Sequence, residues 1–246
     1  MERAFSMINP GDIMTRDSKI DKSKRIWEID FVRGFMLVVM IVLHTLYDLE
    51  NFYNKPINYS DTALMLIKLG PAIFILVSGI SINFSRSSFK RGIIVLAGAL
   101  AVTLFSYIFS PDYLIVFGIL HFFGTCMIIS PLLKKIPTAF LFILSFIIAS
   151  TIFIIPYIKI DNSYLFMLGI YNESFESADY FPLFPWSCFF VFGMAIGRIL
   201  YKEKKSIFKF TIAKNPINFL GRHSLLIYLV HQPVIMGVLA LVMRFF

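Results

Sequence analysis

Four ionisable side chains interrupt an otherwise apolar stretch, DFVRGFMLVVMIVLHTLYDL, which spans residues 30–49. On an α-helix, Arg33 and His44 lie within about 20° of each other around the axis. Asp30 and Asp48 lie within about 60° of Arg33, so all four charges share one face. The Asp48 carboxylate, one turn beyond His44, can accept a proton from one imidazole nitrogen and leave the other nitrogen as a base.

This charged face cannot be turned toward lipid, because an ionisable group in the middle of a bilayer costs about 3 kcal/mol or more. The face must therefore line a protein interior or a water-filled cavity. One reading is a polar network that only ties helices together, and the other is a functional site. Four such residues on one face favour the functional site.

A second candidate lies in FGILHFFGT, where His121 stands between Gly118 and Gly124. Glycines let a neighbouring backbone or a ligand come close to the imidazole. His121 is thus either a second acid or base, or a hydrogen-bonding group between helices.

A third candidate lies in SLLIYLVHQPV, where Ser224, Tyr228 and His231 follow one another at spacings of four and three. This spacing puts them on one helix face, which is typical of a cavity lining or of a polar packing seam. Pro233 has no backbone N–H to donate to the carbonyl of Leu229, so the pattern predicts a break or kink near His231.

The elements that position these residues are membrane helices. The chain is 58% hydrophobic and only 15% charged, and apolar stretches of about 20 residues follow one another almost without pause. We expect an all-α, polytopic bundle of seven transmembrane helices in a single domain, residues 28–246, preceded by a polar, basic tail, residues 1–27. The predicted spans are residues 29–49, 61–84, 91–109, 113–133, 138–156, 181–201 and 219–243.

The basic residues predict the orientation. With these spans, eighteen Lys and Arg residues fall on the side of the amino terminus, against Lys55, Lys159 and Arg244 on the other side. This bias places the amino terminus in the cytoplasm and the carboxy terminus outside. The excess of basic residues behind the net charge of +8 then lies along the cytoplasmic side of the protein, beside anionic lipid, and indicates no nucleic-acid surface.

The connection at residues 157–180 is the one sizeable external segment. It is acidic and leads into DYFPLFPW, which contains Asp179 and Trp186. The connection either covers an external mouth or is a solvated loop. The prolines Pro182 and Pro185 favour a helix start at the membrane interface.

Other kinds of site lack their sequence signatures. The four histidines show no HExxH or other close pairing, so no metal site is predicted. There is no GxSxG elbow, no phosphate-binding loop and no dinucleotide fingerprint. Cys126 and Cys188 lie in apolar stretches and are expected to be buried packing residues.

Four segments together resemble the small bacterial members of the heparan-alpha-glucosaminide N-acetyltransferase catalytic-domain family. They are RIWEIDFVRGFMLVVMIVLHTLYDL, FGILHFFG, DYFPLFPW and FLGRHSLLIYLVHQPVI. The first segment is also similar to the R-x10-H signature of the broader acyltransferase-3-like transmembrane acyltransferases, with Arg33 and His44 at its two ends. The resemblance implies a multi-pass enzyme that moves an acyl group, with acetyl favoured, from cytoplasmic acyl-CoA to an acceptor at or across the membrane. It does not carry over the heparan acceptor, because lysosomal relatives have asparagine where His44 stands here.

Combining the resemblance with the residue patterns gives a role for each candidate. The catalytic candidates are His44 as general base, Asp48 as its orienting partner and His121 as a second acid or base. The candidates for binding acyl-CoA are Arg33, Asp30, Arg222, Ser224 and Tyr228. The candidates for binding the acceptor are His231, Gln232, Trp186 and Asp179.

We expect the enzyme to reside in the cell membrane and to use a hydroxyl or amine of a glycan or lipid as acceptor; self-association into a homo-oligomer is left open. A transporter or lipid-handling protein with an intramembrane charged pathway is the main alternative, although no second half repeats the first. A non-catalytic assembly subunit is a third reading. Consumption of acyl-CoA by the purified protein separates the first reading from the other two.

Overall fold

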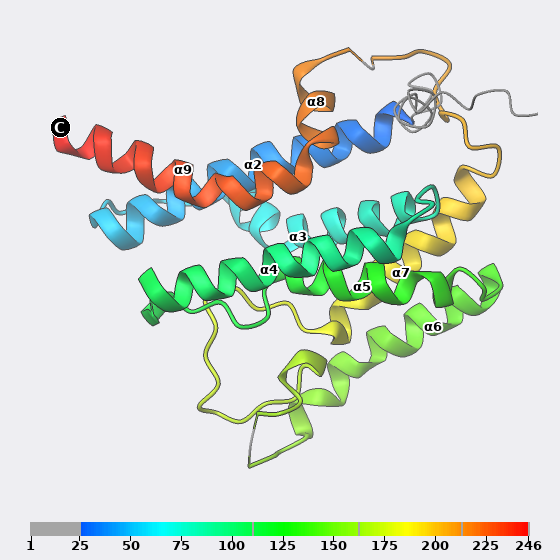
Figure 1. Ribbon diagram of the computed structural model, residues 1–246, viewed down its shortest axis with the longest axis horizontal. Helices are drawn as coiled ribbons and strands as arrows, with labels where there is room; N and C mark the ends of the chain where they lie inside the picture. Colours follow the sequence, from blue (N-terminus) through cyan, green and yellow to red (C-terminus); the bar gives the residue numbers. More distant parts are fainter. Residues whose placement is uncertain (1–25, 110, 162, 213, 246) are drawn as a thin grey trace, which may run out of the picture.

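The computed structural model describes residues 26–109, 111–161, 163–212 and 214–245 (Figure 1). This part of the chain is helical, and its only β pairing is an isolated parallel bridge between Phe117 and Tyr180. The α-helices are α2 (Trp27–Tyr53), α3 (Asp61–Ile82), α4 (Ser88–Phe109), α5 (Ile119–Leu133), α6 (Thr138–Ser150), α7 (Leu183–Leu200), α8 (Pro216–Arg222) and α9 (Ser224–Phe245). Short 3-10 turns are η2 (Pro111–Tyr113), η3 (Thr151–Phe153), η4 (Ile155–Tyr157) and η5 (Phe166–Leu168). The predicted tail, residues 1–27, lies outside the described residues except for its last two.

In the described residues, six helical segments are long and apolar enough to cross a membrane, which supports the expected all-helical, multi-pass protein. They are α2, α3, α4, α6 with its following turns to Tyr157, α7 and α9. The predicted fourth span, residues 113–133, corresponds to α5, which has only 15 residues. At 1.5 Å per residue, α5 is about 22 Å long and does not cross a hydrocarbon core of about 30 Å by itself. The count of seven full-length spans is therefore not reached.

The predicted seventh span, residues 219–243, is divided. The chain leaves helical geometry at His223, which ends α8 and precedes α9. Pro233 lies inside α9, and that helix continues past it to Phe245. Of the predicted break or kink near His231, the break is therefore wrong, and the chain breaks at the start of the segment instead.

Helices α3 and α7 approach each other at backbone distance because glycines occupy their contact. A Cβ atom at Gly79 would overlap the carbonyl of Phe190, and one at Gly193 would overlap the carbonyl of Leu76. Small residues permit this close packing of membrane helices. The largest fully buried apolar side chains lie on α2, α3, α5, α6 and α7 and are Leu37, Ile75, Phe122, Leu141, Phe190 and Met194.

The outer surface is also apolar. Large side chains on α4 are more than half exposed to their surroundings, as expected for a helix that faces lipid. These are Phe89, Ile94, Leu100, Leu104, Phe105, Tyr107, Ile108 and Phe109.

Three connections meet at one end of the bundle. The guanidinium of Arg198 near the end of α7 donates to the carbonyls of Leu133, Lys134 and Ile136, which follow α5. The Lys134 ammonium donates to the carbonyl of Ser85 in the α3–α4 connection at 2.7 Å. Helix α2 begins at this end of the molecule, and α9 ends at the opposite end (Figure 1).

Candidate active site

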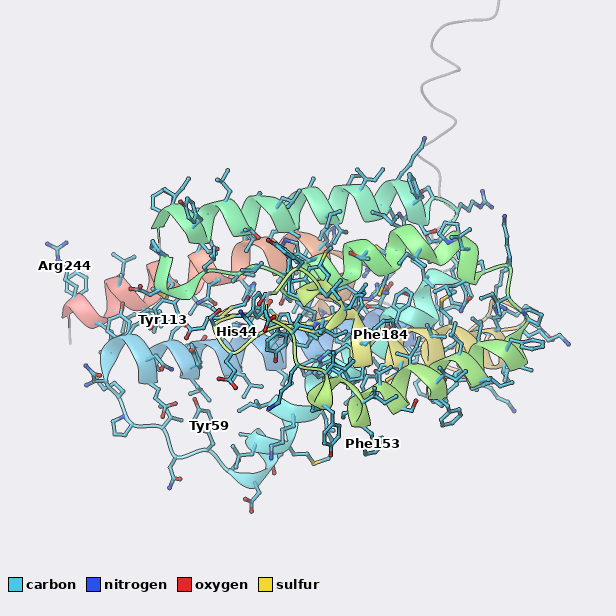
Figure 2. All side chains as sticks on the ribbon, turned by 90° about the horizontal axis from the view of Figure 1, so that it is seen from below. His44, Tyr59, Tyr113, Phe153, Phe184 and Arg244 are labelled. Carbon is cyan, nitrogen blue, oxygen red and sulfur yellow. The ribbon has the colours of Figure 1, made fainter. Side chains whose placement is uncertain are left out.

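His44 lies on α2 with one ring nitrogen fixed. Its Nδ1 is 2.9 Å from the carbonyl oxygen of Met40, one turn earlier. A carbonyl can only accept, so Nδ1 carries the proton and Nε2 of the neutral ring is left with a lone pair. His44 is partly buried, whereas Arg244 projects from the end of the molecule (Figure 2).

Asp48 does not make the expected hydrogen bond to His44. Both of its carboxylate oxygens accept from Nε2 of Gln232 on α9, at 3.0 and 2.9 Å. Asp48 has no exposed surface, and its charge is within electrostatic reach of His44. Asp48 therefore ties α2 to α9 and acts on His44 through its charge. The orienting contact predicted for the imidazole is supplied by Met40.

His231 brings a second imidazole to the same place. Its ring packs edge-on against that of His44, with the centroids 5.1 Å apart. His231 Nδ1 donates to the carbonyl of Tyr228 at 2.6 Å, which again leaves Nε2 as the lone-pair nitrogen. The residue is only 9% exposed, and its Nε2 has no partner among the described residues. A buried imidazole with one committed nitrogen is available to accept a hydrogen bond from a ligand.

Asp179 enters the site from the long connection before α7. Its Oδ2 accepts from the backbone N–H of Ile119 at the start of α5, at 3.0 Å. A Cβ atom at Gly118 would overlap this carboxylate oxygen, so the approach requires glycine. Burial raises the pKa of Asp179, while the bond from Ile119 and the charge of His44 lower it less strongly. The carboxylate is also within electrostatic reach of Tyr228.

The end of this connection is tied down on the segment before α5. Ala178 donates to the carbonyl of Leu114 at 3.0 Å, and Phe181 donates to that of Phe117 at 2.9 Å. The Ser177 hydroxyl accepts from the backbone of Val116. These bonds fix the part of the connection that carries Asp179 against the start of α5.

His121, in the first turn of α5, has its own fixed tautomer. The Thr103 hydroxyl donates its single proton to the carbonyl of Ile115 at 2.7 Å, so it must accept from His121 Nε2, 3.2 Å away. His121 is 5% exposed, and its Nδ1 has no partner within the described parts of the chain. His121 lies two residues beyond the Ile119 amide that Asp179 binds.

The model of the family described as heparan-alpha-glucosaminide N-acetyltransferase, catalytic, matches residues 25–233. The chain belongs to this family. The match contains α2, the histidine-bearing start of α5, the Asp179 connection and the first half of α9. No curated protein and no solved structure matches the chain. Membership of this family implies a transmembrane acetyltransferase, and the family in general uses acetyl-CoA as donor.

For this acetyltransferase-family chain, three of the residues predicted to bind the donor, Asp30, Arg33 and Arg222, lie apart from the imidazoles. Arg33 is 3.7 Å from Asp30, one turn away on α2. This part of α2 contacts α8 at backbone distance, because Gly34 and Gly221 face each other's helices. Arg222 ends α8 and is exposed, with its Nε donating to the carbonyl of Asn218 at 3.1 Å.

Ser224 begins α9, and Tyr228 lies one turn further along it. The ring centroids of Tyr228 and His231 are 5.1 Å apart. One face of α9 therefore runs from Ser224, next to α8, to His231 beside His44. The Trp186 ring packs against Phe181 and Phe189, with centroids 4.9 and 6.1 Å away.

The structure brings together six of the predicted site residues, from α2, α9 and the connection before α7: His44, Asp48, Tyr228, His231, Gln232 and Asp179. Sequence reasoning did not identify Thr103, whose hydroxyl sets the His121 tautomer, or the Met40 carbonyl. The spacing of four between Met40 and His44 was the available signal for the latter. Within the described residues, no group of three or more His, Cys, Asp or Glu side chains is arranged to hold a metal ion.

Proposed function

We propose that this protein transfers an acetyl group from cytoplasmic acetyl-CoA to a hydroxyl or amine of a glycan or lipid at the membrane, with His44 as general base. The observation that carries the proposal is the setting of His44. Its Nδ1 is committed to Met40, its Nε2 is a lone-pair nitrogen, and two carboxylates and a second imidazole surround it. Family membership supplies the reaction class.

In the proposed reaction, Nε2 of His44 takes the proton as the acceptor O–H or N–H bond breaks. The freed oxygen or nitrogen attacks the thioester carbonyl carbon, a new C–O or C–N bond forms, and the C–S bond breaks. The CoA thiolate leaves with a proton returned from the imidazolium, so His44 ends neutral. Nearby negative charges from Asp48 and Asp179 favour the imidazolium that forms in between.

The remaining candidates fall into two groups. The acceptor donates a hydrogen bond to Nε2 of His231, whose ring is fixed by its bond to the Tyr228 carbonyl. His121 serves as a second acid or base beside the start of α5. The donor enters from the basic end, where Arg33 and Arg222 supply positive charge for the CoA phosphates.

Release of CoA thiol from acetyl-CoA tests this function in native membranes, which supply the acceptor. A general base contributes about 10² to 10⁴-fold to rate, so His44→Ala should lose that much activity per folded molecule. Thr45→Val is the matched control, because the Thr45 hydroxyl makes the same kind of bond to the carbonyl one turn earlier, Ile41, at 2.8 Å. Full specific activity in His44→Ala would refute the proposed base. Membranes that transport a solute or lipid but release no CoA would favour the alternative function.

A further inference from the structure

Two cavities lie side by side at the basic end of the bundle, far along α2 from His44. The first has a volume of about 300 Å³ and is lined by Asn83, Phe84, Lys134, Gly197, Arg198, Tyr201, Lys202 and Lys204. The second has a volume of about 420 Å³ and is lined by Arg86, Ser87, Ser88, Phe89, Lys90, Pro131 and Lys134. Lys134 belongs to both, so its side chain separates two basic hollows.

No Asp or Glu lines either cavity in the described part of the chain, although six cationic side chains do. Lys134 is held between them by its bond to the carbonyl of Ser85 at 2.7 Å. Burial lowers the pKa of Lys134, and the charges of Arg198 and Arg91 lower it further. The fold therefore holds like charges together at a cost that a bound anion would offset.

The surroundings indicate which anion. The second cavity is lined by Phe89, which is 51% exposed, and the exposed side chains of Ile93 and Ile94 follow it along α4. An apolar, outward-facing strip that begins at a cationic hollow matches the two parts of a phospholipid. Its phosphate fits the hollow, and its acyl chains fit along α4.

We propose that this face is a binding site for the phosphate of an anionic phospholipid, with Lys134 as its central contact. Two adjoining hollows that share one lysine accommodate two phosphates joined by a short linker. A diphosphatidyl lipid should therefore bind more tightly than a lipid with one phosphate. The site is independent of the reaction proposed above, because none of its lining residues belongs to the imidazole site.

The test is a lipid titration of the purified full-length protein in detergent, followed by native mass spectrometry and by melting temperature. The probes are diphosphatidylglycerol, phosphatidylglycerol, phosphatidylcholine and inorganic phosphate. Lys134→Gln retains a donor for the Ser85 carbonyl but loses the charge, and should weaken binding of diphosphatidylglycerol about tenfold or more. Lys90→Gln, at an exposed position, should weaken it without affecting the fold.

Lys159→Gln is the matched control, because Lys159 is exposed and lies in the connection before α7, outside both cavities. It should bind diphosphatidylglycerol as the wild type does. An equal loss in Lys159→Gln would overturn the site in favour of diffuse surface charge. Equal stabilisation by inorganic phosphate would overturn a lipid ligand, and displacement of the lipid by CoA would assign the cavities to the donor. Equal affinity for phosphatidylcholine would also overturn the proposal.

Discussion

Replacing Asp48 by asparagine removes the negative charge of this side chain but keeps its size, so it distinguishes an electrostatic role in catalysis from a role in holding α2 against α9. In the wild type, Gln232 Nε2 donates to both Asp48 oxygens, while Gln232 Oε1 is buried without a partner in the described structure. An asparagine at this position keeps one acceptor for Nε2 and offers a new N–H to Oε1. We therefore expect Asp48→Asn to melt at or above the wild-type temperature, because it satisfies a buried oxygen and removes a buried charge.

Activity should fall, and its loss can be estimated from the helix. Side chains one turn apart lie about 6 Å from each other. At an effective dielectric constant of about 20, a full pair of charges at that distance is worth about 3 kcal/mol. Because about 1.4 kcal/mol changes a rate tenfold, a fully formed imidazolium at His44 would lose about 100-fold. With the proton only partly transferred in the transition state, we expect about a 10- to 100-fold decrease in kcat.

The assay is CoA thiol release per folded molecule, measured beside the melting temperature. Glu50→Gln is the control on the same helix, because the Glu50 carboxylate accepts from the Tyr59 hydroxyl at 2.9 Å and no described contact joins it to the imidazoles. It should retain wild-type kcat. An unchanged kcat in a stably folded Asp48→Asn protein would refute an electrostatic role for this carboxylate. A large drop in melting temperature would refute the amide pairing with Gln232.

Three more outcomes are expected. Gly118→Ala should lower the melting temperature by displacing the Asp179 carboxylate and should reduce activity, whereas Gly237→Ala, with open space around it, should do neither; equal behaviour of the two would contradict the contact. Burial raises the folded-state pKa of Asp179 above the ordinary value of 3.8, so the folded protein favours the protonated carboxyl. The stabilisation from this carboxyl is present in acid and is lost as the pH rises. The melting temperature of Asp179→Asn should therefore depend less on pH above about pH 4 than that of the wild type. Arg33→Ala should raise KM for acetyl-CoA, measured by CoA release, while the exposed Lys209→Ala should not; equal effects would indicate surface charge alone.

Apolarity and spacing predicted most of the helices but misjudged where α5 and α9 begin. Residues 113–118 are as apolar as the helix that follows, yet they run in an extended or turn conformation and pair with the segment from Ala178 to Phe181. Phe117 is only 3% exposed, so its apolarity reflects burial under that segment. Hydropathy measures burial and cannot separate a buried extended segment from a membrane helix. The break at His223 was missed because the predicted span of residues 219–243 continued through the polar junction of Arg222, His223 and Ser224.

The candidate site was predictable where its residues share one helix. Rotation by 100° per residue placed Arg33, His44 and Asp48 on one face of α2, and the same arithmetic aligned Tyr228 with His231 on α9. Contacts between different elements could not be predicted from helix rotation. The bond from Gln232 to Asp48 depends on how α2 crosses α9, and the approach of Asp179 depends on a connection with little regular structure of its own.

The fixed tautomers constrain how protons can move through the site. His44 and His231 each commit Nδ1 to a backbone carbonyl, so each acts through Nε2 alone. Their rings are 5.1 Å apart, so positive charges on both rings at once would repel each other. Acetyl transfer moves one proton from the acceptor to the CoA sulfur. Asp48 and Asp179 are both within electrostatic reach of His44, so a positive charge that forms on this ring during proton transfer is stabilised by two carboxylates.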